Sequence, residues 1–201
     1  MTEAGGPGRY PESMSEITVV PATPERWNDV LACLGGDGDK GCWCQAWRGV
    51  EISGEPRKDA LRRQLATNAV PPGFLAYLDG EIAGWVGVSV RTLTPRLVRS
   101  RTIPAFDDLP VWSVGCFRIR PGFRRKGVAS ALLAGVVEAA RAAGAPGVEG
   151  YPIDPGGRRV DVVQGFVGIA STFDKAGFRR VMDTNAHSAG LTRLLVRLDL
   201  R

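Results

Sequence analysis

The sequence is poor in the residues and segments that mark several common protein classes. It has a single histidine, His187, and no stretch approaches the roughly 18 consecutive apolar residues that a membrane helix requires. Residues 1–10 contain no apolar core, so we expect no secretory signal peptide. These absences disfavour a membrane protein and a secreted protein, and they favour a cytoplasmic location.

The cysteines are few and are not spaced as metal ligands. There are four, and the closest two, Cys42 and Cys44, are separated by one residue rather than by the two that are usual in zinc sites. Without a secretory signal we expect reduced thiols that pack as small apolar residues. Cys116 lies in an apolar segment without a basic neighbour, so we expect an inert thiol there and no metal site in the chain.

The charge balance is basic but not concentrated. The chain of 201 residues has 26 Lys and Arg against 21 Asp and Glu, which gives a net charge of +5. This excess suits an anionic ligand. Nucleic acid is a weaker interpretation, because the basic residues are scattered and no zinc-finger or RNA-binding motif is present. We expect a disordered tail over residues 1–15 and one globular domain over residues 16–201.

Apolar periodicity and turn residues predict an alternation of strands and helices. The expected strands are Ile17–Val20, Phe74–Leu78, Glu81–Val90, Val111–Ile119, Gly147–Pro152, Phe178–Met182 and Leu191–Leu198. The expected helices are Pro24–Leu34, Glu55–Asn68, Gly127–Ala143 and Phe166–Ala176. Asp79-Gly80 predicts a hairpin turn, and two glycines in the following strand, Gly84 and Gly87, predict a bulge or a close backbone approach. This order is typical of a mixed α/β domain with helices on both faces of the sheet.

The turn between the strand Val111–Ile119 and the helix Gly127–Ala143 has the composition of an anion site. The first amides of a helix have no intrahelical acceptor, and they point at the end where the helix dipole is positive. Gly127 would let an anion approach the backbone closely. We expect the anion to be bound by Arg124, Arg125, Lys126, Gly127, Val128, Ala129 and Ser130. The alternative interpretation is an ordinary turn with solvated cations.

Two motifs about fifty residues apart in this chain resemble those of the GCN5-related N-acetyltransferase (GNAT) family. They are Arg124-x-x-Gly127-x-Ala129, which is similar to the family's pyrophosphate loop, and the segment Ser171–Phe178. Three shorter segments are similar to a bacterial branch of that family, namely Cys42–Arg48, Val111-Trp112 with Cys116-Phe117, and Glu149–Pro152. The resemblance implies a six- or seven-stranded mixed sheet that splays between two central parallel strands. It also implies acetyl-CoA as co-substrate, with its pantetheine arm on main-chain groups near Phe117 and Ile119.

The reaction that the resemblance implies is direct attack of a primary amine, from a small molecule or a lysine side chain, on the acetyl thioester. In the family a tyrosine beside the cofactor often protonates the leaving thiolate, and the matching residue here is Phe173. The strand Val111–Ile119 also carries no carboxylate. We therefore expect Glu149 as the general base and Tyr151 as the general acid. Otherwise, Glu149 is a solvated edge residue and Tyr151 a packing residue.

Several interpretations remain open at this level. Because Phe173 lacks a proton to donate, the chain is either an enzyme or a catalytically silent acyl-CoA sensor. The segment Cys42–Trp47 either packs over the core or lines the substrate pocket. The basic segment Arg91–Leu109 is either a solvated connection or a functional loop. The acyl group, the acceptor and the oligomeric state, including a homodimer, are also open.

Overall fold

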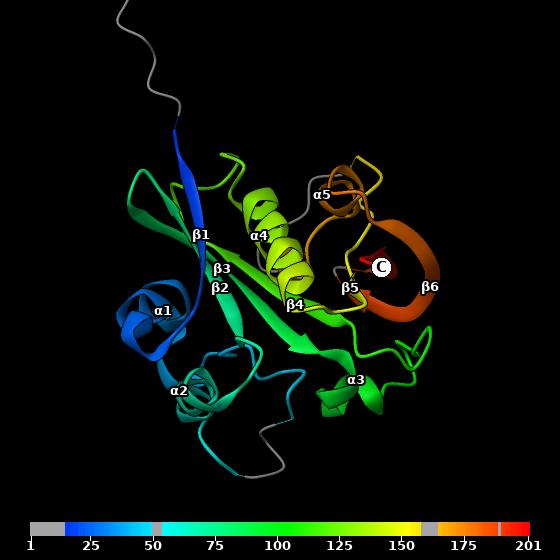
Figure 1. The fold of residues 1–201 in the computed structure, drawn as a ribbon, viewed down its shortest axis with the longest axis horizontal. Helices are drawn as coiled ribbons and strands as arrows, with labels where there is room; N and C mark the ends of the chain where they lie inside the picture. Colours follow the sequence, from blue (N-terminus) through cyan, green and yellow to red (C-terminus); the bar gives the residue numbers. More distant parts are fainter. Residues whose placement is uncertain (1–14, 50–53, 158–164, 189) are drawn as a thin grey trace, which may run out of the picture.

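A computed structural model describes residues 15–49, 54–157, 165–188 and 190–201. Within these ranges one sheet of seven strands has the order β1-β2-β3-β4-β5-β7-β6 (Figure 1). The strands are β1 Ile17–Pro21, β2 Gly73–Leu78, β3 Glu81–Val90, β4 Trp112–Ile119, β5 Gly147–Gly150, β6 Arg179–Ser188 and β7 Leu191–Asp199. Strands β4 and β5 pair in parallel and the other neighbours pair antiparallel. The predicted mixed α/β sheet is confirmed, whereas the predicted tail over 1–15 falls almost entirely outside the described residues.

Helices cover both faces of this sheet. The longer ones are α1 Trp27–Leu34, α2 Arg57–Thr67, α4 Val128–Ala142 and α5 Ala170–Lys175. The short ones are η1 Pro24–Arg26, η2 Gly35–Lys40, η4 Arg91–Leu93, α3 Pro95–Val98 and η5 Gly165–Val167. Helix α4 crosses the front of the central strands in Figure 1 and packs with β1, β2 and β3.

Alternation along the strands sorts the core into layers. In β2, Phe74 and Ala76 belong to the core beneath α4, whereas Leu75 belongs to the core beneath α1 and α2. In β3, Val86 belongs to the core beneath α4 and Trp85 to the core beneath α1 and α2. The period of two that predicted these strands therefore also decides which helix each residue contacts. The hairpin turn has the expected left-handed backbone, with φ of 51° at Asp79 and 81° at Gly80.

Strands β4 and β5 separate after three residue pairs. The last pair is Val114 with Gly150, and β4 then continues alone along β3 as far as Ile119. Next to β3 the register shifts at the same point, because Val88 pairs with Val114 and Gly87 with Cys116, which leaves Gly115 unpaired. A bulge of this kind bends the strand that contains it. The predicted splay is thus present, and we call this point the fork.

The segment Arg91–Leu109 contains more structure than a solvated loop. It includes η4 and α3, which begins after Thr94 with Pro95 in its first turn. The Thr94 hydroxyl donates to the carbonyl of Val90 at 2.7 Å, and Leu97 is buried. A third small core, next to α3 on the face opposite α4, contains Leu97, Ile103, Tyr151 and Leu195.

The expectation that all four cysteines are reduced is wrong for two of them. Cys44 and Cys116, 72 residues apart, form a disulfide, while Cys33 and Cys42 are free. A Cβ on Gly87 would lie 3.0 Å from each of the two bonded sulfurs, so the absence of a side chain there leaves room for the pair. The bulge in β4 turns the Cys116 side chain toward the segment that contains Cys44. The sequence did not predict this contact.

Candidate functional site

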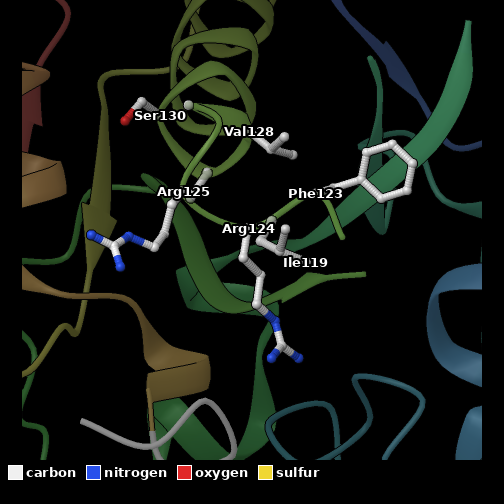
Figure 2. Close-up of a pocket in the computed structure, with 8 residues that line it drawn as sticks. Ile119, Phe123, Arg124, Arg125, Val128 and Ser130 are labelled. Atoms are coloured by element: carbon white, nitrogen blue, oxygen red, sulfur yellow. The ribbon is translucent and has the colours of Figure 1, made fainter. Parts of the chain in front are cut away.

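A pocket of about 210 Å³ lies at the start of α4, where the sequence predicts the anion site. The residues that line it are Ile119, Phe123, Arg124, Arg125, Gly127, Val128, Ala129 and Ser130. Figure 2 shows Arg124 and Arg125 extending from the turn to different sides, below the first turn of the helix. All the predicted turn residues except Lys126 therefore line one pocket.

The backbone of this turn explains its capacity for an anion. Arg125 has φ of 62° and Gly127 has φ of 81°, so left-handed residues alternate along the turn. Such alternation makes successive N–H groups converge on one point. Gly127 is the N-cap of α4, and no side chain caps the helix. The first amides of α4 therefore remain available to a ligand.

The three cationic side chains of the turn are exposed. Among the described residues, Arg124, Arg125 and Lys126 form no ion pair. The Lys126 ammonium lies 5.8 Å from the centre of the Phe123 ring. This cation–π contact is at the surface, so the charge of Lys126 stays exposed to solvent. These cations can therefore supplement the backbone amides when a polyanion binds.

The edge of β4 that continues beyond the fork provides a second binding element. After Val114 no described strand pairs with β4 on its β5 side. Main-chain groups along such an edge can bind an extended ligand as if it were an added strand. Ile119, at the end of this edge, also lines the pocket, so the edge and the turn are continuous. Phe117, the other residue predicted here, has its ring in the core beneath α4.

Phe173 is a packing residue in this structure. Its side chain is fully buried and meets Phe117 and Phe178 edge-to-face at centroid distances of 6.1 and 5.1 Å. A Cβ on Gly150 would lie 2.2 Å from its ring. Phe173 does not line the pocket at α4. The ring thus fills the space beside the fork, and its contact with a cofactor stays a prediction.

Glu149 and Tyr151 lie together on the face of the sheet opposite α4. The Tyr151 hydroxyl donates to Oε2 of Glu149 at 3.2 Å and lies 3.2 Å from the hydroxyl of Ser113. Register explains the cluster, because Glu149 pairs with Ser113 on β4 and with Arg197 on β7. Glu149 is only 1% exposed, so the interpretation of this residue as a solvated edge residue is wrong.

Two buried arginines surround the Glu149 carboxylate. Nε of Arg91 lies 3.6 Å from one carboxylate oxygen, and Nη1 of Arg197 lies 3.5 Å from the other. Burial raises the pKa of Glu149, and the two arginines oppose that rise. Burial also raises the pKa of Tyr151 well above its ordinary range, and the Glu149 charge adds to this effect. Tyr151 therefore keeps its proton at neutral pH.

Three more buried arginines lie near the fork. Arg91 belongs to the basic segment for which a functional role was left open, whereas Arg197 was not predicted, and neither was Arg193, which packs against Trp47 and Tyr151. One signal was available, since Arg193 and Arg197 stand four residues apart in an otherwise apolar predicted strand and must share a face. The partners of these arginines come from distant segments of the chain, so the contacts themselves could not be predicted from the sequence.

Comparison with known proteins identifies the family. Residues 39–149, more than half of the 201, match the model of the acetyltransferase (GNAT) family. The chain therefore belongs to this family, and membership indicates acyl transfer from coenzyme A. No curated protein sequence gives a significant match.

Solved structures share the fold at low sequence identity. An N-acetyltransferase from Staphylococcus aureus Mu50 is 16% identical, with a TM-score of 0.56 over 93% of this chain and 100% of that one. The histone acetyltransferase HPA2 and related acetyltransferase from Corynebacterium glutamicum is 20% identical, with a TM-score of 0.53 over 92% and 96%. An aminoglycoside acetyltransferase in complex with coenzyme A is 14% identical, with a TM-score of 0.54 over 92% and 95%.

Two further features are absent from the described residues. No helix there has both the length and the apolar character needed to cross a membrane. No group of three or more His, Cys, Asp or Glu side chains in the same residues is arranged to hold a metal ion.

Proposed function

We propose that this protein is an N-acetyltransferase that transfers the acetyl group of acetyl-CoA to a primary amine of a small molecule or of a lysine side chain. One observation carries the proposal. The uncapped, left-handed turn at α4 adjoins the unpaired edge of β4, and Ile119 belongs to both. An anion site next to an unpaired strand edge matches the two chemically different parts of coenzyme A, its pyrophosphate and its pantetheine arm.

The residues of the turn and strand fit this co-substrate by their donor types. The amides of Gly127, Val128, Ala129 and Ser130 would bind the pyrophosphate, with charge supplied by Arg124, Arg125 and Lys126. Main-chain groups of β4 near Phe117 and Ile119 would hold the pantetheine arm. When bound, acetyl-CoA supplies the activated acetyl group as a thioester.

Transfer forms a bond from the amine nitrogen to the acetyl carbon and breaks the bond from that carbon to sulfur. A protonated amine must lose one proton before it can attack and a second one after attack, and the leaving thiolate takes up one of the two. Glu149 is our candidate acceptor and Tyr151 our candidate donor. Both side chains are buried, and the hydrogen bond of 3.2 Å between them would let a proton pass from one to the other. The raised pKa keeps Tyr151 protonated at neutral pH and makes it a weak acid, so its donation to the thiolate would have to be coupled to uptake of a proton from Glu149.

Release of the coenzyme A thiol tests this function. Purified protein is mixed with acetyl-CoA and a panel of small amines, amino acids and lysine peptides, and free thiol is followed with a disulfide reagent. Transfer predicts release that depends on both the protein and one class of amine. Binding of acetyl-CoA without thiol release for any amine would favour the sensor alternative. That alternative is supported by Phe173, which has no proton to donate, and by the ion pairs of Glu149.

A further inference from the structure

Arg193 packs against two aromatic rings, which also contact each other, on the face of the sheet opposite α4. It is 5% exposed, and its guanidinium carbon lies 4.9 Å from the ring centre of Trp47 and 5.8 Å from that of Tyr151. Its Nε donates to the carbonyl of Tyr151 at 3.0 Å. The stack and this bond fix the plane of the guanidinium group.

The guanidinium is not satisfied by the protein. Its Nη2 is buried and has no hydrogen-bond partner. Among the described residues no carboxylate lies within ion-pair distance of it. The aromatic rings stabilise the positive charge, and Nε is satisfied by the Tyr151 carbonyl, but the N–H donors of Nη2 remain unused. A buried charge with an unpaired donor is costly, so such groups normally have a partner.

The neighbouring charges are already used by other arginines. Arg197 contacts Asp107 at 2.7 Å, Asp199 at 2.8 Å and Glu149 at 3.5 Å. Arg91 also forms an ion pair with Glu149, through Nε. Its Nε and Nη1 nevertheless make no hydrogen bond. The buried charged residues in the described chain are thus three arginines and one glutamate. Together with Asp107 and Asp199 the carboxylates equal the arginines in number, but Arg193 is the one of the three arginines without an ion pair among the described residues.

The unpaired Arg193 lies close to the fork. Trp47, which stacks on Arg193, approaches to 3.2 Å of the position that a Cβ on Gly115 would occupy. Gly115 is the bulged residue at which β4 leaves β5. Tyr151, which carries the other ring, follows directly after β5. The free donor of Arg193 is therefore near the point where an acyl group on β4 would meet an acceptor.

We propose that Arg193 binds the carboxylate of the acceptor, so that the substrate is an amine that also carries a carboxylate, as a free amino acid does. This inference rests on the proposed acetyltransferase function. A guanidinium presents parallel N–H donors that match a carboxylate. The single unpaired cation suits one negative charge better than the near-double charge of a phosphate ester. Burial lowers the pKa of Arg193 only to about 10, which leaves it cationic at neutral pH.

The test compares each standard amino acid with its own amide, using thiol release from acetyl-CoA to obtain kcat/KM. In the wild-type protein at least one acid should exceed its amide by about tenfold or more. Arg193→Gln should reduce that ratio to about twofold or less. Arg180→Gln, an exposed arginine on β6 that pairs with Asp183, is the control and should keep the wild-type ratio. Arg193→Lys should lose most of the ratio, because a point charge cannot replace the planar donors.

A ratio near one in the wild type, or an unchanged ratio in Arg193→Gln, would overturn the assignment. If no amine is acetylated, binding affinity replaces kcat/KM as the measured quantity. N-acetyl amino acids and their amides are titrated into protein saturated with coenzyme A, and only the acids should bind, with at least about tenfold loss in Arg193→Gln. Equal binding of both, or none, overturns the inference. Titration of acetyl-CoA into the same samples reports separately on the proposed function, and thermal unfolding reports on the fold.

Discussion

Val114 and Gly150 form the last rung between β4 and β5, and the residue after Val114, Gly115, pairs with nothing across on β3. The sheet therefore opens and β4 bulges at the same position. The bulge bends β4 away from β5. The same strand then leads directly into the turn at Gly127. One continuous segment thus provides the unpaired edge and the anion site.

We predict that Phe173→Tyr does not restore a proton donor. The end of the Phe173 ring faces Gly150, since a Cβ there would lie 2.6 Å from Cζ. A hydroxyl on Cζ would overpack this contact and lower the free energy of unfolding by about 1–3 kcal/mol. Urea denaturation and the rate of thiol release are the two measurements.

Phe166→Tyr is the control for that substitution, because Phe166 is 39% exposed and should tolerate the hydroxyl. Its free energy of unfolding should change by less than about 0.5 kcal/mol. A Phe173→Tyr protein with wild-type stability and a raised kcat would show that the ring reaches the reacting thiolate after all.

We predict that Gly135→Ala destabilises the protein although alanine is the better helix former. A Cβ on Gly135 would lie 2.5 Å from Cγ1 of Val19 on β1, and the β-branched valine cannot rotate away freely. Overpacking costs about 1–3 kcal/mol, which exceeds the gain in helix propensity of roughly 1 kcal/mol. Thermal or urea unfolding measures the loss.

The double variant Val19→Ala with Gly135→Ala separates packing from propensity. It should be more stable than the sum of the two single changes predicts, by about 1 kcal/mol or more. Strict additivity would mean that this contact does not set how closely α4 packs on the sheet.

The stability difference between the wild type and Glu149→Gln should depend on pH. Because burial raises the Glu149 pKa, the folded state holds the proton more tightly than the unfolded state does. As the pH rises through the ordinary carboxyl pKa of about 4.3, the wild type should lose stability relative to the glutamine variant until the raised folded-state pKa is passed. Unfolding of both proteins near pH 4 and near pH 7 measures it. A difference that grows in favour of the wild type toward neutral pH would mean that Arg91 and Arg197 outweigh burial.

The sequence predicts those parts of the site that are contiguous in the chain. The strand, turn and helix from Val111 to Ala143 carry their own signals, namely an apolar strand, a basic turn that contains Gly127, and an apolar helix. Each of these acts over a few residues, so no knowledge of the rest of the fold is needed. Structure and prediction agree there to within one residue.

The polar cluster at the fork could not be predicted in the same way. Its members Arg91, Glu149 and Arg197 come from three separated segments, and their contacts depend on the register of β4, β5 and β7. A one-residue slip would reverse the face on which each side chain lies. The short helix at Pro95 escaped prediction because one turn is too brief to show a helical period.

Gly127→Glu should abolish binding of acetyl-CoA. The carboxylate would occupy the anion site and repel the phosphates, and a side chain at φ of 81° adds strain. Gly144→Glu is the matched control, since Gly144 lies beyond the other end of α4 with φ of 68° and open space around it. Both variants add the same charge and a similar strain of about 1–2 kcal/mol, so only the position differs.

Calorimetric titration of acetyl-CoA into the wild type and these two variants tests the account most directly. The wild type and Gly144→Glu should bind with dissociation constants within about twofold of each other, and Gly127→Glu should show no binding up to about 1 mM ligand. Failure of the wild type to bind at that concentration, or equal affinity in Gly127→Glu, would contradict the assignment of the turn at α4 as the coenzyme A site.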